Sequence, residues 1–296
     1  MAGKYDPEVV SFIADQILES ILDAEKNLCS SKIGFESIHV PQLVENRLVP
    51  NEADVEDPYL RVLKMVSECQ GTAVLSSFAA HSTCLFKDNM LLSGDYPSML
   101  NLKLESDSSV DFSLFAAGAM ASMRPSHPHG IRKYEKLEYV SDTLKEVLVQ
   151  KVPTISAEEV FQIGHDEIPI NMPEPAFRVS NSLQLRPWVF DLLMGRSEVY
   201  VKSFQVGNTL FVGLPCDFSG ELMAPLDDEA NQSKLNLVVN SFNGGYVGYI
   251  TRDDRYHLNK YETRMMNWFG PYMGKFFSQL VSNTIHLHKA TDHENE

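Results

Sequence analysis

The stretch Gly71-Thr-Ala-Val-Leu-Ser-Ser-Phe-Ala-Ala80 is nearly continuous in small and apolar residues, and it leads directly into His81. A short run of this kind is typical of a β-strand that is covered on both faces. Such a strand needs layers packed above and below its sheet. The stretch therefore favours an α/β fold.

Further strand patterns lie on both sides of this stretch, over Lys32–Val40, Tyr59–Val66, Ser109–Gly118 and Leu235–Phe242. The dipeptide Gly207-Asn208 separates two more runs and has the turn chemistry of a β-hairpin. The second strand of that hairpin is expected over Thr209–Pro215.

Helical spacing of apolar residues predicts helices over Val9–Leu28, Lys133–Lys151, Ser219–Asn231 and Met265–His288, with a shorter one ending at Leu104. The first of these is expected to lie on the surface and to face the core. Residues 154–186 alternate short strand signals with proline-rich turns, which suggests an excursion over the surface. We expect one α/β domain over residues 1–296, with mixed β-sheet layers flanked by helices.

Composition excludes several classes of protein. The chain has 296 residues, 44% of them hydrophobic, which is globular composition, and its formal net charge of −15 disfavours nucleic acid as a partner. No signal peptide is expected at the start, and no apolar run approaches the roughly 18 residues of a membrane span. The four widely spaced cysteines are expected to be buried small hydrophobes.

Three expected strand ends each carry a possible metal ligand, namely His81, Asp217 and Tyr249. Ligands gather at the carboxyl ends of strands in α/β sheets, so these side chains are expected to converge. Taken alone, His81 fits a buried imidazole bonded to a backbone carbonyl better than a metal ligand. His127 and His129 fit an exposed turn, and His286 and His288 are expected on the surface.

The segment from Asn243 to Glu262, with Phe269-Gly270-Pro271 beyond it, favours the metal-ligand interpretation of His81 over the structural one. It resembles the neutral (alkaline, non-lysosomal) ceramidase family, whose signature is N-x-x-x-x-Y-x-T-x-x-E-Y-x-x-x-x-Y-E followed by Phe/Tyr-Gly-Pro. Three shorter pieces resemble the same family in the same order, namely Phe78-Ala-Ala-His81-Ser-Thr, Ser93-Gly94-Asp95 and Val212-Gly-Leu-Pro-Cys-Asp217-Phe218. The resemblance spans roughly residues 8 to 275.

The resemblance implies a zinc-dependent hydrolase of amide bonds that acts on N-acyl sphingoid lipids. It assigns His81, Asp217 and Tyr249 as zinc ligands and Tyr261 as the catalytic tyrosine that bonds the developing oxyanion. Histidine nitrogen and carboxylate oxygen are ordinary zinc ligands, and an open position would hold the water. The implied substrate is a lipid-like amide.

Several departures from the family predict reduced activity. Asp217 stands where the family has glutamate, and Arg124 stands where it has a serine. The chain is expected to be incomplete on its N-terminal side, without the family's upstream His-x-His segment, and to lack its immunoglobulin-like C-terminal domain. Two alternatives stay open, a catalytically inactive ceramidase-like binding or scaffold protein and a fragment that needs its missing N-terminal part. Localisation and oligomeric state are left open.

Overall fold

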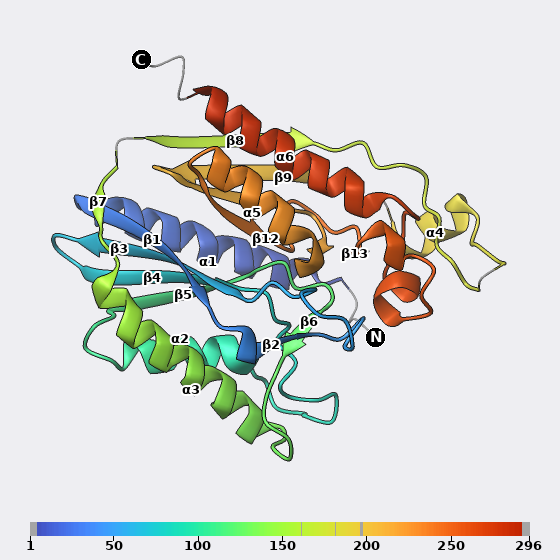
Figure 1. Cartoon of the computed structure of the whole chain (residues 1–296). Coiled ribbons are helices and arrows are strands. Elements are labelled where there is room, and N and C mark those ends of the chain that lie inside the picture. The colour runs from blue at the N-terminus through green and yellow to red at the C-terminus, as the bar shows by residue number, and fades with distance from the viewer. Residues whose placement is uncertain (1–4, 161, 181, 196–197, 292–296) are drawn as a thin grey trace.

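The computed structural model describes residues 5–160, 162–180, 182–195 and 198–291, and two β-sheets with separate hydrophobic cores organise it (Figure 1). The first sheet has the strand order β5-β4-β3-β1-β7. Its strands are β1 (Ser31–His39), β3 (Tyr59–Ser67), β4 (Gly71–Phe78), β5 (Phe112–Ala117) and β7 (Glu158–Glu159). Only the β4–β5 pair is parallel, so the sheet is mixed.

Two helices, α2 (Asp95–Glu105) and α3 (Tyr134–Lys151), pack below this sheet. Four of their leucines recur at helical spacing and are fully buried, namely Leu100, Leu104, Leu144 and Leu148. These side chains form one core with Val62, Val74 and Phe78 of the sheet. The nearly continuous apolar run of β4 is thereby explained.

The second sheet has the order β12-β10-β9-β8. Its strands are β8 (Ile163–Pro169), β9 (Tyr200–Val206), β10 (Thr209–Gly213) and β12 (Asn236–Asn240). The predicted hairpin is β9–β10, and β10 pairs in parallel with β12. The covering helices are α5 (Met223–Gln232) and α6 (Met273–Thr291). The expected α/β fold with mixed sheet layers flanked by helices is confirmed.

Shorter elements connect the strands and helices of the two halves. They are β2 (Val44–Asn46) with β6 (Met123–Pro125), β11 (Asp217–Phe218) with β13 (Tyr249–Ile250), the helix α4 (Pro187–Met194), the 3₁₀ turns η1 (Pro41–Leu43), η2 (Val152–Thr154), η3 (Gly220–Leu222) and η4 (Asp253–Arg255), and a π-helical turn η5 (Tyr261–Met265). The predicted terminal helix begins later than expected, because residues 261–272 form this turn and a loop.

The two halves meet where β4, β5 and β12 end. Asn240 Nδ2 donates to Ser77 Oγ at 3.2 Å, and Ser241 N donates to Ala117 O at 3.0 Å. A partly buried ion pair, Arg61 with Asp227 at 2.6 Å, joins β3 to α5. The residues that follow β4 and those that follow β10 and β12 are therefore held close together.

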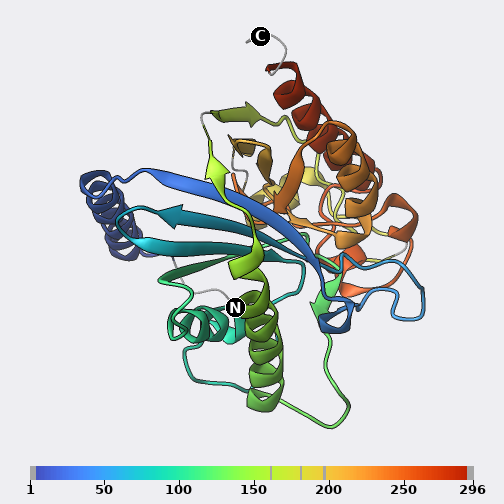
Figure 2. The ribbon, with the colours of Figure 1, turned by 60° about the vertical axis from the view of Figure 1, so that its left-hand side comes forward.

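The N-terminal helix α1 (Pro7–Lys26) corrects one expectation. Its start is specified locally, because Asp6 caps the helix by accepting from Glu8 N and Pro7 suits the first turn. None of its residues is buried, so its apolar stripe does not face the core as predicted. The helix stands apart from the two halves in Figure 2.

Two other expectations were also wrong. Cys84 and Cys216 are buried free thiols, but Cys29 and Cys69 form a disulfide with their Cα atoms 6.3 Å apart. The antiparallel pairing of β1 with β3 opposes Ser31 to Ser67, which brings the two flanking cysteines together. His288 is buried rather than exposed, because its face of α6 packs on β9 and its Nε2 lies 2.9 Å from Ser203 Oγ.

No helix among the described residues combines the length and apolar character that crossing a membrane requires.

Candidate metal and hydrolase site

The first site residue, His81, follows β4 through Ala79 and Ala80, which are both buried. Its backbone N–H donates to Met123 O at 3.4 Å, which ties the strand end to β6. The imidazole itself is largely covered, with 12% of its side chain exposed. The histidine therefore points into the junction between the two halves.

Asp217 and Tyr249 lie side by side, because β11 and β13 pair in parallel with these two residues in register. Asp217 N also donates to Gly248 O at 3.0 Å. Gly248 has φ +86°, and a Cβ there would lie 2.3 Å from Met266 O. Only glycine fits immediately before Tyr249, so the local sequence fixes the approach of this strand to Asp217.

The structure brings the three predicted ligands together. His81 Nε2 lies 3.2 Å from Asp217 Oδ2 and 3.2 Å from Tyr249 Oη. The His81 and Tyr249 rings are stacked, with centroids 5.7 Å apart. Residues from β4, β11 and β13 thus meet around one point, as the strand-end argument predicted.

The Asp217 carboxylate is the most constrained group of the site. It is completely buried, and neither of its oxygens has a hydrogen-bond partner of good geometry, although Oδ2 is in charge contact with His81. A buried carboxylate without such partners costs free energy unless a cation or a donor compensates it. The site therefore has unused capacity to bind a positive group.

Burial raises the pKa of the Tyr249 hydroxyl, and the charge of Asp217 raises it further. The guanidinium of Arg47 opposes this rise. In the absence of a bound cation, Tyr249 is therefore a neutral phenol at pH 7.

Tyr261, the predicted catalytic tyrosine, opens the π-helical turn η5 and is about half exposed. Its ring meets that of Tyr249 edge to face, with centroids 5.8 Å apart. Single π-helical turns occur often at functional sites. The tyrosine is therefore both in contact with Tyr249 and open to solvent.

Arg47 is a residue of this site that the sequence reasoning missed. Its Nε lies 2.7 Å from Glu262 Oε1, and its Nη2 donates to Ala121 O at 3.2 Å. The side chain thus connects the loop after β2 with the turn that carries Tyr261. A single arginine in a loop without a pattern carries no signal, so only the three-dimensional structure reveals it.

Arg124, which stands in place of the family's serine, projects from β6 and pairs with Glu45 at 2.7 Å near the surface. Ser122 is completely buried, with its Oγ against Ser219 Oγ and 3.4 Å from Glu221 Oε2. His127 lies in a loop, where its Nδ1 is 2.9 Å from Pro128 O.

An aromatic pocket of about 670 Å³ adjoins the site. Tyr246 and Val247 line the pocket, and Val247 N donates to Pro215 O at 2.7 Å, two residues before Asp217. Burial, and then the charge of Asp217, raise the pKa of the Tyr246 hydroxyl. The Tyr246 ring meets Trp268 edge to face at 5.4 Å. The remaining apolar lining includes Met172, Pro173, Phe190, Met194 and Phe269.

Two of the three distances between these side chains can be compared with the spacing of ligand atoms around a zinc ion. In a tetrahedral shell with bonds of about 2.0 to 2.1 Å, neighbouring ligand atoms lie about 3.3 to 3.4 Å apart. The two contacts of His81 Nε2, at 3.2 Å each, are close to this value. No group of three or more His, Cys, Asp or Glu suited to a metal is found in the described part of the chain. Of the three side chains that meet here, only His81 and Asp217 are of these residue types.

Comparison with known proteins supports the fold. No protein-family model matches the chain, and no curated protein matches it. Among solved structures, it is similar to the neutral ceramidase from Pseudomonas aeruginosa, with a TM-score of 0.75, 16% identity and coverage of 97% of this chain and 57% of that one. A ceramidase complexed with C2 matches with a TM-score of 0.67, 16% identity and coverage of 86% and 53%.

The chain thus spans little more than half the length of the solved structures that it matches. An identity of 16% with a TM-score of 0.75 establishes a shared fold, in agreement with the resemblance read from Asn243 to Glu262. The chain has the fold of the neutral ceramidases.

Proposed function

We propose that this chain is a ceramidase-like amide hydrolase of reduced activity, which binds zinc through His81, Asp217 and Tyr249. The observation that carries the proposal is the convergence of these three side chains around a completely buried carboxylate, whose Oδ2 lies 3.2 Å from His81 Nε2. A bound zinc ion would lower the pKa of its water toward about 7 and polarise the amide carbonyl.

The protein's own residues supply the rest. Tyr261 is in contact with Tyr249 and open to solvent, so its hydroxyl can donate to the oxyanion that develops on the amide carbonyl. Arg47 adds a fixed positive charge beside Tyr249 and favours the phenolate that a tyrosine ligand requires. Tyr261 would thus act on charge that the reaction creates, whereas Arg47 would act on the charge of a metal ligand.

The adjoining aromatic pocket supports a lipid-like substrate. Its volume of about 670 Å³ is within the range of ligand pockets, and its apolar lining suits a hydrocarbon chain. The fold similarity to ceramidases points to the same class, an N-acyl sphingoid lipid. The amide would then lie at the mouth of the pocket, next to Tyr246.

The direct test is hydrolysis of a fluorogenic ceramide with zinc added. We expect turnover slower than that of the Pseudomonas enzyme, because Asp217 is one methylene shorter than glutamate. Tyr249→Phe should reduce the remaining rate by about 10²-fold or more, by analogy with losing one group at a catalytic site. Tyr272→Phe, at a largely exposed position, is the matched control and should leave the rate unchanged.

A second candidate is an inactive lipid-binding relative. The direct contact of His81 with both Asp217 and Tyr249 also suits a metal-free polar cluster, which favours this alternative. It predicts that fluorescent ceramide binds with the same affinity in the presence of a chelator, without turnover. Chelator-sensitive turnover that Tyr249→Phe abolishes would exclude it.

A further inference from the structure

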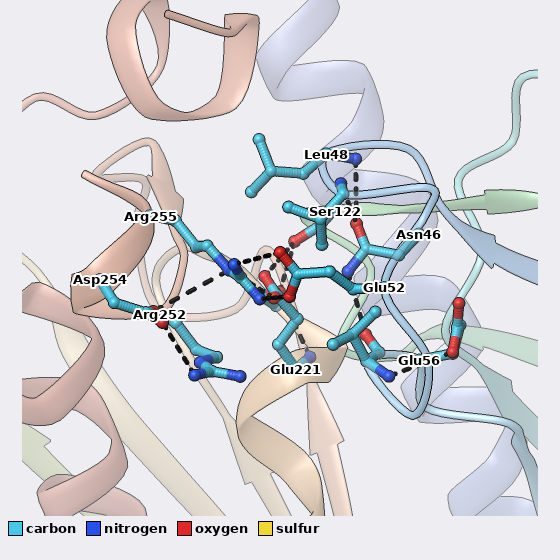
Figure 3. A network of polar contacts seen from close by, with 12 residues as sticks. Asn46, Leu48, Glu52, Glu56, Ser122, Glu221, Arg252, Asp254 and Arg255 are labelled. Carbon is cyan, nitrogen blue, oxygen red and sulfur yellow. Dashed lines mark hydrogen bonds and ion pairs between the residues drawn. The ribbon is translucent and has the colours of Figure 1, made fainter. Parts of the chain in front are cut away.

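Arg255 forms a three-way ion pair beside the candidate site (Figure 3). Its Nε lies 3.0 Å from Glu221 Oε1, while Nη1 donates to Glu52 Oε1 at 2.8 Å and Nη2 donates to Glu52 Oε2. One guanidinium therefore binds two carboxylates, one of them in the bidentate geometry that fixes orientation.

The inner half of this ion pair is buried. The Glu221 side chain is 0% exposed and that of Arg255 is 10% exposed, whereas the Glu52 side chain is 48% exposed. Burial raises the pKa of Glu221, and the charge of Arg255 opposes that rise. Burial outweighs the opposing charge of Arg255, so the pKa of Glu221 lies above its usual value, and Arg255 Nε remains 3.0 Å from Glu221 Oε1.

The three residues lie on the three segments that build the site. Glu221 lies in η3, shortly after Asp217, and Arg255 lies in η4, shortly after Tyr249. Glu52 lies in the loop that begins with Arg47. Each segment thus contributes one residue to the candidate site and one to the ion pair.

The parallel pairing of β11 with β13, which aligns Asp217 with Tyr249, has only two residue pairs. Two-stranded pairings of this length are marginal by themselves and need ties from elsewhere. The Arg255–Glu221 contact joins the same two segments just beyond this pairing. The bidentate contact with Glu52 adds the loop of Arg47.

We propose that Arg255 is a positioning residue, which holds Asp217, Tyr249 and Arg47 in their mutual geometry through Glu221 and Glu52. The inference rests on the proposed function, because it assigns Arg255 to the same zinc site. A purely stabilising role would affect global unfolding and leave the geometry of the folded site unchanged.

The test compares Arg255→Gln with Arg252→Gln. Both substitutions remove one cation from the same loop, but Arg252 pairs with Asp254 at 2.8 Å near the surface. Zinc affinity is measured by competition with a chromophoric chelator. We expect Arg255→Gln to lose about 10- to 100-fold in zinc affinity, as for partners that orient metal ligands, and Arg252→Gln to stay within about twofold of wild type.

A double variant separates positioning from stability. Glu221→Gln/Arg255→Gln leaves no buried unpaired charge, so its global stability in urea should recover relative to Arg255→Gln. Its zinc affinity should stay low, because the contacts of Arg255 with Glu221 and Glu52 are still missing. Recovery of both stability and zinc affinity would overturn the proposal, as would equal zinc affinities in the two single variants.

If the wild-type chain binds no zinc, amide hydrogen exchange of the metal-free protein tests the positioning role of Arg255. That result would refute the proposed function and not the positioning role. We expect Arg255→Gln to speed amide exchange in residues 47–57 and 246–262, with β4 and β10 unchanged, while Arg252→Gln does not. Unchanged exchange in both segments would overturn the positioning role, whatever the zinc result.

Discussion

The two long helices near the ends of the chain have similar patterns and opposite environments. α1 has 20 residues and buries none, whereas α6 has 19 and buries Phe277, Val281 and Ile285 in the second core. The start of α6 also supports the candidate site, because Lys275 N donates to Asp253 Oδ1 at 3.3 Å. Apolar periodicity therefore predicts a helix but not what the helix packs against.

The largest expected effect is at the centre of α6. Phe277→Ala removes a fully buried ring and should lower the free energy of unfolding by about 3 to 5 kcal/mol, as large-to-small core substitutions do. Urea denaturation measures this. A loss below about 1 kcal/mol would mean that α6 is no better packed than α1.

The second effect concerns α5, which packs against α6 and carries Asp227. Burial raises the pKa of Asp227 to about 6, whereas an unfolded aspartate titrates near about 3.9. Between about pH 4 and 6 the folded chain keeps a proton that the unfolded chain releases, so the stability contributed by Asp227 falls as pH rises.

The difference in unfolding free energy between wild type and Asp227→Asn should therefore fall by about 2 kcal/mol from pH 4 to pH 6 and stay flat above it. Denaturation of both chains across this range measures it. A difference that rises with pH would show that the ion pair with Arg61 outweighs burial.

The next effect is at Gly274 in the first turn of α6. A Cβ there would lie 2.4 Å from Thr251 O and 2.9 Å from Asp253 Oδ1. Gly274→Ala must push the helix away from the segment that follows Tyr249, at a cost of about 1 to 2 kcal/mol. Urea denaturation gives the cost. An unchanged midpoint would show that α6 does not press on this segment.

The smallest effect is expected in α1. Ile17→Ala shortens a side chain that is 57% exposed, and the free energy of unfolding should change by about 0.5 kcal/mol or less. The same denaturation experiment measures it. A loss as large as that of Phe277→Ala would show that the apolar stripe of α1 is buried in solution.

The sequence predicted the convergence of His81, Asp217 and Tyr249 better than it predicted the residues around them. His81, Asp217 and Tyr249 each follow a recognisable strand pattern, and their convergence follows from the sheet topology. Arg47 lies in a loop and the buried Glu221 in the short 3₁₀ turn η3, and no sequence pattern connects either of them to the site. The disulfide between Cys29 and Cys69 depends on the register of β1 with β3, which residue spacing does not encode.

The central claim, a zinc site between His81, Asp217 and Tyr249, is tested most directly by anomalous diffraction at the zinc absorption edge from crystals grown with zinc. We predict one strong peak about 2.0 to 2.3 Å from His81 Nε2, an Asp217 oxygen and Tyr249 Oη. The absence of a peak at this position with zinc in excess, or a peak only elsewhere, for example at His127 and His129, would contradict the account.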